Sequence, residues 1–139
     1  MEIYFLNTGK KIGKPYIAFI SDSCVMIDLD DITYEKVIKI AERLLEKHNL
    51  GGYVVIISSP QHYHLVFNSP ANWKLIIQIL FRFRKMSIEA WAKNQAQKGF
   101  CALRVNSKNG HKPKIIFEKG QTDKAISEYK QILLQFGDC

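Results

Sequence analysis

The chain has 139 residues, 47% of them hydrophobic and 24% charged, and a net charge of +7, which is the composition of a folded protein and not of a disordered chain. No stretch approaches the roughly 20 apolar residues of a membrane span, and the N-terminal charges follow a short apolar patch, the reverse of their order in a signal peptide. Three cysteines without a CxxC pair are not typical of a disulfide framework or a zinc knuckle, so we expect a cytoplasmic protein. From the length of the chain we expect one domain covering residues 1–139, and from the lack of a long apolar run we expect no membrane partner.

The first half of the chain predicts four strands and one helix. The second apolar run, after a tight turn at 21–23, is too continuously apolar to be half exposed, so we expect it in the centre of a sheet. A 3.6-residue period then predicts a helix, which the Asn-Leu-Gly-Gly sequence at 49–52 ends. The Ser-Ser-Pro-Gln sequence at 58–61 predicts a hairpin between the last two strands. The predicted strands cover 16–20, 24–28, 53–57 and 62–67, and the helix covers 34–48.

The second half predicts three helices and two strands. Ser69 followed by Pro70 is typical of a helix N-cap and its first turn, and Thr122 is a candidate cap for the last helix. The sequence NSKNGH at 106–111 predicts a turn, so we expect the strands on either side of it to pair. The predicted helices cover 71–83, 87–97 and 122–136, and the strands cover 100–105 and 114–117.

This order of elements predicts an α+β fold. Its centre is a βαββαβ unit of the ferredoxin-like or RNA-recognition-motif-like (RRM-like) kind, with an antiparallel sheet and helices packed on one face. In that arrangement the first and third strands of the unit are neighbours in the middle of the sheet. We therefore expect the strands at 24–28 and 62–67 to lie side by side.

Two aspartates, Asp28 and Asp30, follow one another at the end of the first of these strands. Because they are two residues apart, their side chains share one face of the strand. Such a pair is suited to Mg²⁺ or Mn²⁺, which bind carboxylates, substrate phosphates and water, and two such ions stabilise the attacking and leaving oxygens of a phosphoryl transfer. Alternatively, Asp30 or Asp31 caps the following helix, although a cap does not explain Asp28.

Two histidines, His62 and His64, begin the other central strand. They also share a face, while Tyr63 points to the opposite one. Their residue type suits a metal ligand, a phosphate contact or a packing residue. The predicted adjacency of the two strands favours a common site for His64, Asp28 and Asp30, and it leaves the role of His62 open.

The positive charge is concentrated in one part of the chain. Residues 82–119 contain ten Lys and Arg against two acids, which gives this segment +8 and the remaining residues −1. This asymmetry indicates a polyanionic partner, with nucleic acid first and an acidic membrane second, unless the lysines form an ordinary solvated surface. Arg82, Arg84 and Lys85 lie among phenylalanines, and they are our candidates for contacts to nucleic acid.

These motifs resemble those of the archaeo-eukaryotic primases, which include plasmid and archaeal primase-polymerases. The sequence VMIDLD, with Asp28 and Asp30, is similar to the hhhDhD strand of that family, where h is a hydrophobic residue. SSPQHYH is similar to the family's SPGxYH form, with Ser59 and His64 at the matching positions, and GFCALRVNSK is similar to an LRxxxK segment of small archaeal members. The similarity extends over residues 16–108.

The resemblance implies a domain of DNA replication that transfers nucleotides with the help of Mg²⁺ or Mn²⁺. Its partners would be nucleoside triphosphates, DNA, an RNA primer and other primase subunits. The implied roles are metal binding for Asp28 and Asp30, triphosphate binding for Ser59 and His64, and the phosphate or template path for Arg104 and Lys108.

The family also has an acid in a third motif, after the next helix. The candidate is Glu89, in a segment that we expect to be helical. With Glu89 as a metal ligand the domain would be catalytic. With Glu89 as a surface residue, the domain would be an accessory primase subunit that keeps the fold and binds nucleic acid.

Two other classes stay open. His62-Tyr63-His64 fits the His-hydrophobe-His pattern of HUH endonucleases, in which two imidazoles hold a divalent ion and a helix tyrosine attacks a DNA phosphate. Tyr129 is the candidate nucleophile, although it falls on the apolar face of the last predicted helix. The third class is a non-catalytic RRM-like nucleic-acid binder, which needs aromatic residues at outward positions of the central strands.

Overall fold

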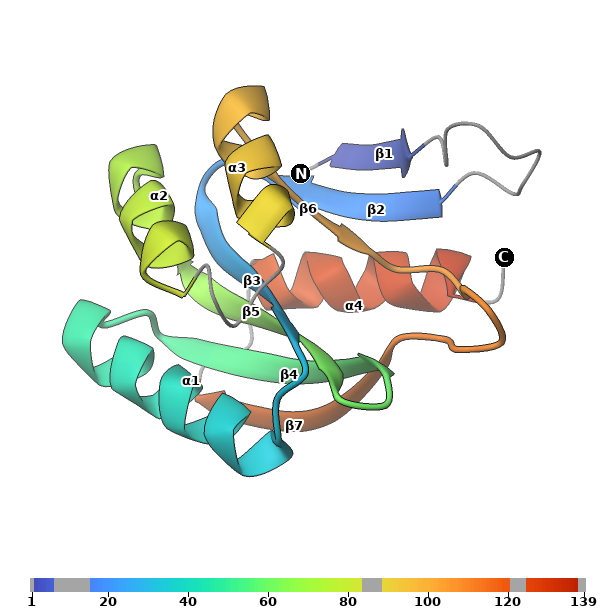
Figure 1. The fold of residues 1–139 in the computed structure, drawn as a ribbon, viewed down its shortest axis with the longest axis horizontal. Helices are drawn as coiled ribbons and strands as arrows, with labels where there is room; N and C mark the ends of the chain where they lie inside the picture. The colour runs from blue at the N-terminus through green and yellow to red at the C-terminus, as the bar shows by residue number, and fades with distance from the viewer. Residues whose placement is uncertain (1, 7–15, 84–88, 121–124, 138–139) are drawn as a thin grey trace.

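The computed structural model describes residues 2–6, 16–83, 89–120 and 125–137, which contain seven strands and four helices (Figure 1). The strands are β1 (Glu2–Leu6), β2 (Tyr16–Ser21), β3 (Cys24–Asp30), β4 (Gly52–Ser59), β5 (His62–Pro70), β6 (Cys101–Arg104) and β7 (Lys114–Gly120). The helices are α1 (Tyr34–His48), α2 (Trp73–Arg82), α3 (Glu89–Lys98) and α4 (Ala125–Phe136). Within these described ranges, no helix has the length and apolar character needed to cross a membrane.

The strands form two sheets in which every pair is antiparallel. The smaller sheet has the order β1-β2-β6, and the larger has the order β3-β5-β4-β7. The predicted α+β class and the antiparallel pairing are therefore confirmed. Strand β1, which pairs with β2, was not predicted, because its five residues form only a short apolar patch in the sequence.

Strand β5 lies at the centre of the larger sheet, between β3 and β4. Most side chains of these three strands are buried, so their sequences are largely continuous apolar runs instead of an alternating pattern. The predicted adjacency of β3 and β5 is confirmed, with Met26 opposite Val66 and Ile27 opposite Leu65. The predicted central position of β3 is wrong: β3 is an edge strand of the larger sheet as described, because β6 pairs with β2 instead of extending the sheet beyond β3. The predicted β4–β5 hairpin is confirmed as well, and Gln61 adopts a positive φ of 63° in its turn.

Helices cover both faces of the larger sheet. On β7, Lys119 pairs with Glu42 of α1, whereas the adjacent Glu118 pairs with Lys130 of α4. Adjacent strand residues point to opposite faces, so α1 and α4 lie on opposite sides. Figure 1 shows α4 between the two sheets and α1 beyond β4. The prediction of helices on one face is wrong, because strands that are buried on both faces need cover on both sides.

The predicted pairing of the last two strands is also wrong. The turn itself forms, with Asn109 and Gly110 at positive φ and one bridge between Lys108 and His111. The ladder does not continue because Pro113 has no N–H to donate. Strand β6 pairs with β2 instead, and β7 pairs with β4.

The predicted bounds of α1 agree with the structure, and the predicted ends of the other three helices agree to within one residue. The predicted starts at 87 and 122 lie outside the described residues, and α2 begins later than predicted. Strand β5 extends through Ser69 and Pro70, and the side chain of Asn72 caps α2 by accepting from the backbone N–H of Leu75 at 2.8 Å. Thr33 caps α1, so Asp30 and Asp31 do not have that role. The predicted cap Thr122 lies outside the described residues.

Candidate functional site

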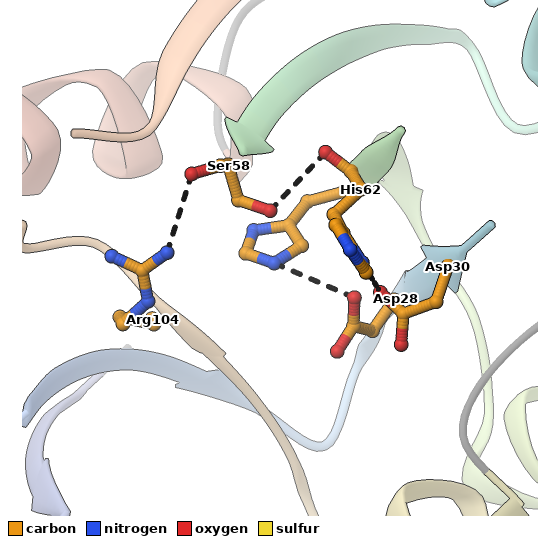
Figure 2. A network of polar contacts seen from close by, with 6 residues as sticks. Asp28, Asp30, Ser58, His62 and Arg104 are labelled. Carbon is orange, nitrogen blue, oxygen red and sulfur yellow. Dashed lines mark hydrogen bonds and ion pairs between the residues drawn. The ribbon is translucent and has the colours of Figure 1, made fainter. Parts of the chain in front are cut away.

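Two Asp–His pairs face each other across β3 and β5, at the end of the sheet where the β4–β5 hairpin turns. In the strand register Asp28 lies opposite His64, and Asp30 lies opposite His62. We call Asp28 and His64 the inner pair, and Asp30 and His62 the outer pair. The two aspartates are two residues apart on β3, the two histidines are two residues apart on β5, and the register places them opposite each other. All four side chains therefore project from one face of the sheet, as predicted from their spacing. Figure 2 shows the carboxylates of Asp28 and Asp30 close to His62.

In the outer pair, His62 Nδ1 and Asp30 Oδ1 form a direct hydrogen bond and are 2.5 Å apart. The side chain of His62 is 39% exposed and that of Asp30 is 14% exposed. The second carboxylate oxygen, Asp30 Oδ2, is buried and has no hydrogen-bond partner among the described residues. Aspartate therefore orients the imidazole at the edge of the site and keeps one oxygen for another ligand.

The inner pair is less closely joined, and its histidine is more deeply buried, whereas the two aspartates are similarly exposed. His64 Nε2 lies 3.6 Å from Asp28 Oδ1, and the two side chains are 6% and 18% exposed. Burial and the nearby Asp30 carboxylate raise the pKa of Asp28 to about 7, whereas burial and the charges of Arg104 and His62 lower the pKa of His64 to about 3. His64 is therefore neutral at pH 7, and the inner pair is not a salt bridge despite its distance.

Arg104, at the end of β6, brings positive charge to this site. Its guanidinium donates to the carbonyl of Ser58, at 3.4 Å (Figure 2). It also donates to the carbonyl of His111, at 3.3 Å, and to that of Asn106. These bonds join the end of β4 to the segment that follows β6. The charge of Arg104, together with that of Lys108, opposes the rise in the pKa of Asp28. The structure thus brings both predicted cations into electrostatic range of the inner pair.

The two adjacent serines at the end of β4 differ in their contacts. Ser59 is half-buried and lies opposite His62 in the strand register, but the side-chain hydroxyl that donates to the His62 carbonyl, at 3.2 Å, belongs to Ser58. A register shift between Ile57 and Ser59 accounts for this difference. A one-residue bulge gives no signal in the sequence SSPQ.

Asn106 is another residue whose role the sequence did not reveal. Its buried side-chain oxygen accepts from the backbone N–H of Ile17, at 2.9 Å, while its carbonyl accepts from Arg104. Asn106 thus fixes the segment after β6 against β2. Asparagine in a turn-rich stretch is usually a turn former, so this position had no distinguishing pattern.

The other predicted nucleic-acid and metal residues are only partly described. Arg82 is exposed at the end of α2, with its guanidinium 5.6 Å from the ring centre of Phe83. Arg84 and Lys85 lie outside the described residues. Glu89 is the first residue of α3, and its side chain is not described. In the part of the chain that is described, no group of three or more His, Cys, Asp and Glu side chains is arranged to hold a metal ion.

Tyr129, the candidate nucleophile of the HUH alternative, is fully buried. Its ring packs edge-on against Phe19, with 5.2 Å between ring centres, and burial raises its pKa. Its hydroxyl has no hydrogen-bond partner among the described residues. A phosphate of DNA has no access to this hydroxyl, so the position of Tyr129 does not favour a covalent tyrosine mechanism.

Comparisons with protein-family models, with curated proteins and with solved structures found no match to this chain.

Proposed function

We propose that this chain is a primase-polymerase-like domain that binds a nucleoside triphosphate and a divalent metal ion and acts on nucleic acid. The observation that carries this proposal is the meeting of Asp28, Asp30 and His64 on one face of the adjacent strands β3 and β5, with Arg104 in electrostatic range. Carboxylates, a neutral imidazole and cations on one face suit triphosphate binding and phosphoryl transfer.

The strand order supports an RRM-like core, which we propose to be β3-α1-β4-β5-α2. The order β3-β5-β4 places the first and third strands of this unit side by side. The fourth strand departs from the simple pattern. Strand β6 contacts β3 but pairs with β2, while β7 extends the sheet on the β4 side. This departure leaves β3 at the edge of the larger sheet as described, but β3 and β5, which carry the site, are still paired.

The donor atoms at the site fit Mg²⁺ or Mn²⁺ held by Asp28 and Asp30. Asp30 Oδ2 is buried without a hydrogen-bond partner among the described residues, and an uncompensated buried oxygen is costly. Burial and the Asp30 carboxylate raise the pKa of Asp28 to about 7, and a bound cation would favour the ionised form of this carboxyl. Two carboxylates suffice, because Mg²⁺ takes its other ligands from phosphates and water. Once bound, the ion would stabilise charge on the phosphate oxygens.

The other side chains would position the triphosphate. The Nδ1 atom of His64 is buried and has no hydrogen-bond partner within the described part of the chain, and the low pKa of this histidine keeps it neutral. It could therefore donate one neutral hydrogen bond to a phosphate oxygen. Arg104 would add charge from a fixed position, because three backbone carbonyls orient its guanidinium. Lys108, exposed in the turn, would lie closer to solvent and the template.

The basic segment supports nucleic acid as the second substrate. Residues 82–119 carry +8, and this segment includes Arg104, Lys108 and Arg82. A site for phosphoryl transfer and a positive segment in one small domain suit a polymerising enzyme. Other primase subunits remain proposed partners, since such enzymes hold a primer and template with additional domains.

The test is a denaturing gel. A labelled primer-template and a labelled single strand are incubated with the protein, nucleoside triphosphates and either Mn²⁺ or Mg²⁺, and a chelator serves as the control. We expect products longer than the input that the chelator abolishes. Unextended substrate that still shifts on a native gel would contradict a transferase and favour an accessory subunit. Shorter products with label attached to the protein would favour the HUH alternative instead.

A further inference from the structure

A groove of about 490 Å³ lies between the start of β7 and the end of α4. Its floor is aliphatic and includes Ile115, Leu133 and Leu134, and the lining residues also include Lys112, Lys114 and Lys130. None of the residues of the inner and outer pairs lines it. The groove is therefore a feature separate from the candidate site, and an inference about it does not depend on the proposed function.

The side chain of Leu134 extends the apolar surface of this groove to the outside of the molecule. It lines the groove, yet it is 82% exposed. A single exposed leucine is ordinary, but here the exposed side chain continues an aliphatic depression. A small ligand enclosed in the groove would leave this side chain in water. An occupant that covers Leu134 has to extend beyond the groove, which favours a macromolecule.

The charge of the lining residues limits the kind of macromolecule. The groove residues that are described include three lysines and no acid. Lys130 pairs with Glu118, but the lining still has more positive than negative groups. A complementary partner has apolar side chains for the floor and acidic side chains beside them. Nucleic acid is also acidic, but its bases stack on aromatic side chains, and this floor is aliphatic.

The edge of the sheet indicates how such a partner lies. Strand β7 is an edge strand of the larger sheet as described, and a register shift opposite Val55 and Ile56 interrupts its ladder. Bulges and charged side chains such as Lys114 are features that prevent a further strand from adding to an edge. An amphipathic helix needs no free strand edge, because it places side chains at intervals of three and four residues into a groove.

We propose that the groove between β7 and α4 binds an acidic amphipathic helix of a partner protein. Leucine-like side chains of that helix occupy the aliphatic floor and cover Leu134. Its carboxylates lie beside Lys112 and Lys114.

The experiment uses the full chain and a fluorescein-labelled synthetic helix with leucines on one face and glutamates on the other. Fluorescence anisotropy measures its affinity for the wild type, for Leu134→Asp and for Gln131→Asp. Gln131 is exposed on the same helix and does not line the groove, so Gln131→Asp adds the same negative charge to α4 outside the proposed binding site. We expect Leu134→Asp to weaken binding by at least about tenfold and Gln131→Asp to change it by less than about twofold.

Peptide sequence gives a second control. A version with lysines in place of the glutamates, or with serines in place of the leucines, should not bind. Three results would overturn the proposal: no saturable binding, an equal loss in the two protein variants, or displacement of the peptide by an oligonucleotide whose own binding requires Leu134. Self-association in sedimentation that Leu134→Asp abolishes would also overturn it, because the occupant would then be a second copy of the chain.

Discussion

The inner and outer pairs contain the same two residue types on the same two strands, yet they differ in their chemical state. The outer pair reaches solvent and forms a short hydrogen bond between His62 and Asp30. The inner pair is 3.6 Å apart, and burial moves the pKa values of its two members in opposite directions, both toward the neutral form. The two aspartates are similarly exposed, so burial of the histidine, and not residue type, distinguishes the two pairs. Each pair has one buried atom without a hydrogen-bond partner among the described residues, Asp30 Oδ2 in the outer pair and His64 Nδ1 in the inner pair.

The largest effect is expected from Asp28→Asn, which removes the buried carboxylate of the inner pair. If Asp28 binds the metal ion, extension on the denaturing gel should fall by about 100-fold or more, because loss of one electrostatic contact to a transition state commonly has that effect. The fold should be retained, since Asn is nearly isosteric and does not need to ionise. Circular dichroism checks this point.

Asp31→Asn is the matched control for that change. Asp31 lies three residues further along the chain, but it is exposed and has a positive φ of 52°, which asparagine also adopts readily. Its substitution should leave extension unchanged within about twofold. An equal loss in both variants would indicate a general effect of charge and would contradict a specific role for Asp28.

A smaller contrast is expected between the two histidines. His64→Gln should weaken triphosphate binding by about tenfold, the value of one lost hydrogen bond to a charged group. His62→Gln should weaken it by about threefold or less, because His62 already bonds Asp30 and is 39% exposed. Titration with a fluorescent nucleotide measures both affinities. A larger loss for His62→Gln would reverse the proposed roles of the pairs.

The pH dependence of stability can separate the two members of the inner pair. Asp28, whose pKa rises from 3.8 to about 7 on folding, contributes stability at low pH that is lost as pH rises toward 7. His64, whose pKa falls from 6.5 to about 3, contributes stability above pH 6.5 that is lost as pH falls toward 3. Between these limits the two dependences oppose each other.

Asp28→Asn should remove the contribution of Asp28 to the pH dependence of stability and should leave only that of His64. In urea denaturation with chelator, the free energy of unfolding of this variant, relative to the wild type, should fall as pH drops from 6.5 toward 4. The expected slope is at most about 1.4 kcal/mol per pH unit, the value for one proton. A difference between variant and wild type that is constant across this range would show that the carboxyl of Asp28 does not titrate there.

The core of the fold could be predicted because its signals are local. Continuous apolar runs marked β3, β4 and β5, and the 3.6-residue period marked α1. Pairing over long distances could not be predicted in the same way. The strands on either side of the turn at 106–111 were adjacent in sequence, but Pro113 ends their ladder and each pairs with a distant strand. The side on which a helix packs is likewise a property of the whole structure.

The candidate site was predictable to the same extent. The two-residue spacing placed Asp28 with Asp30 and His62 with His64, and the topology made the two strands neighbours. The sequence did not reveal which histidine is buried, because burial depends on the surrounding elements. The contacts of Ser58 depend on a bulge, for which the sequence has no signal.

The smallest effect is expected from Tyr129→Phe. The hydroxyl of Tyr129 is buried without a hydrogen-bond partner among the described residues, so its removal should change the free energy of unfolding by less than about 1 kcal/mol, or increase it slightly. Activity on DNA should stay within about twofold, because the hydroxyl has no access to a phosphate. Tyr129→Ala, in contrast, removes the ring that packs on Phe19 and should cost about 3–5 kcal/mol. A nucleophile would show the opposite pattern: Tyr129→Phe would abolish cleavage and leave stability intact. Urea denaturation and the denaturing gel, applied to both variants, therefore separate a core tyrosine from a catalytic one.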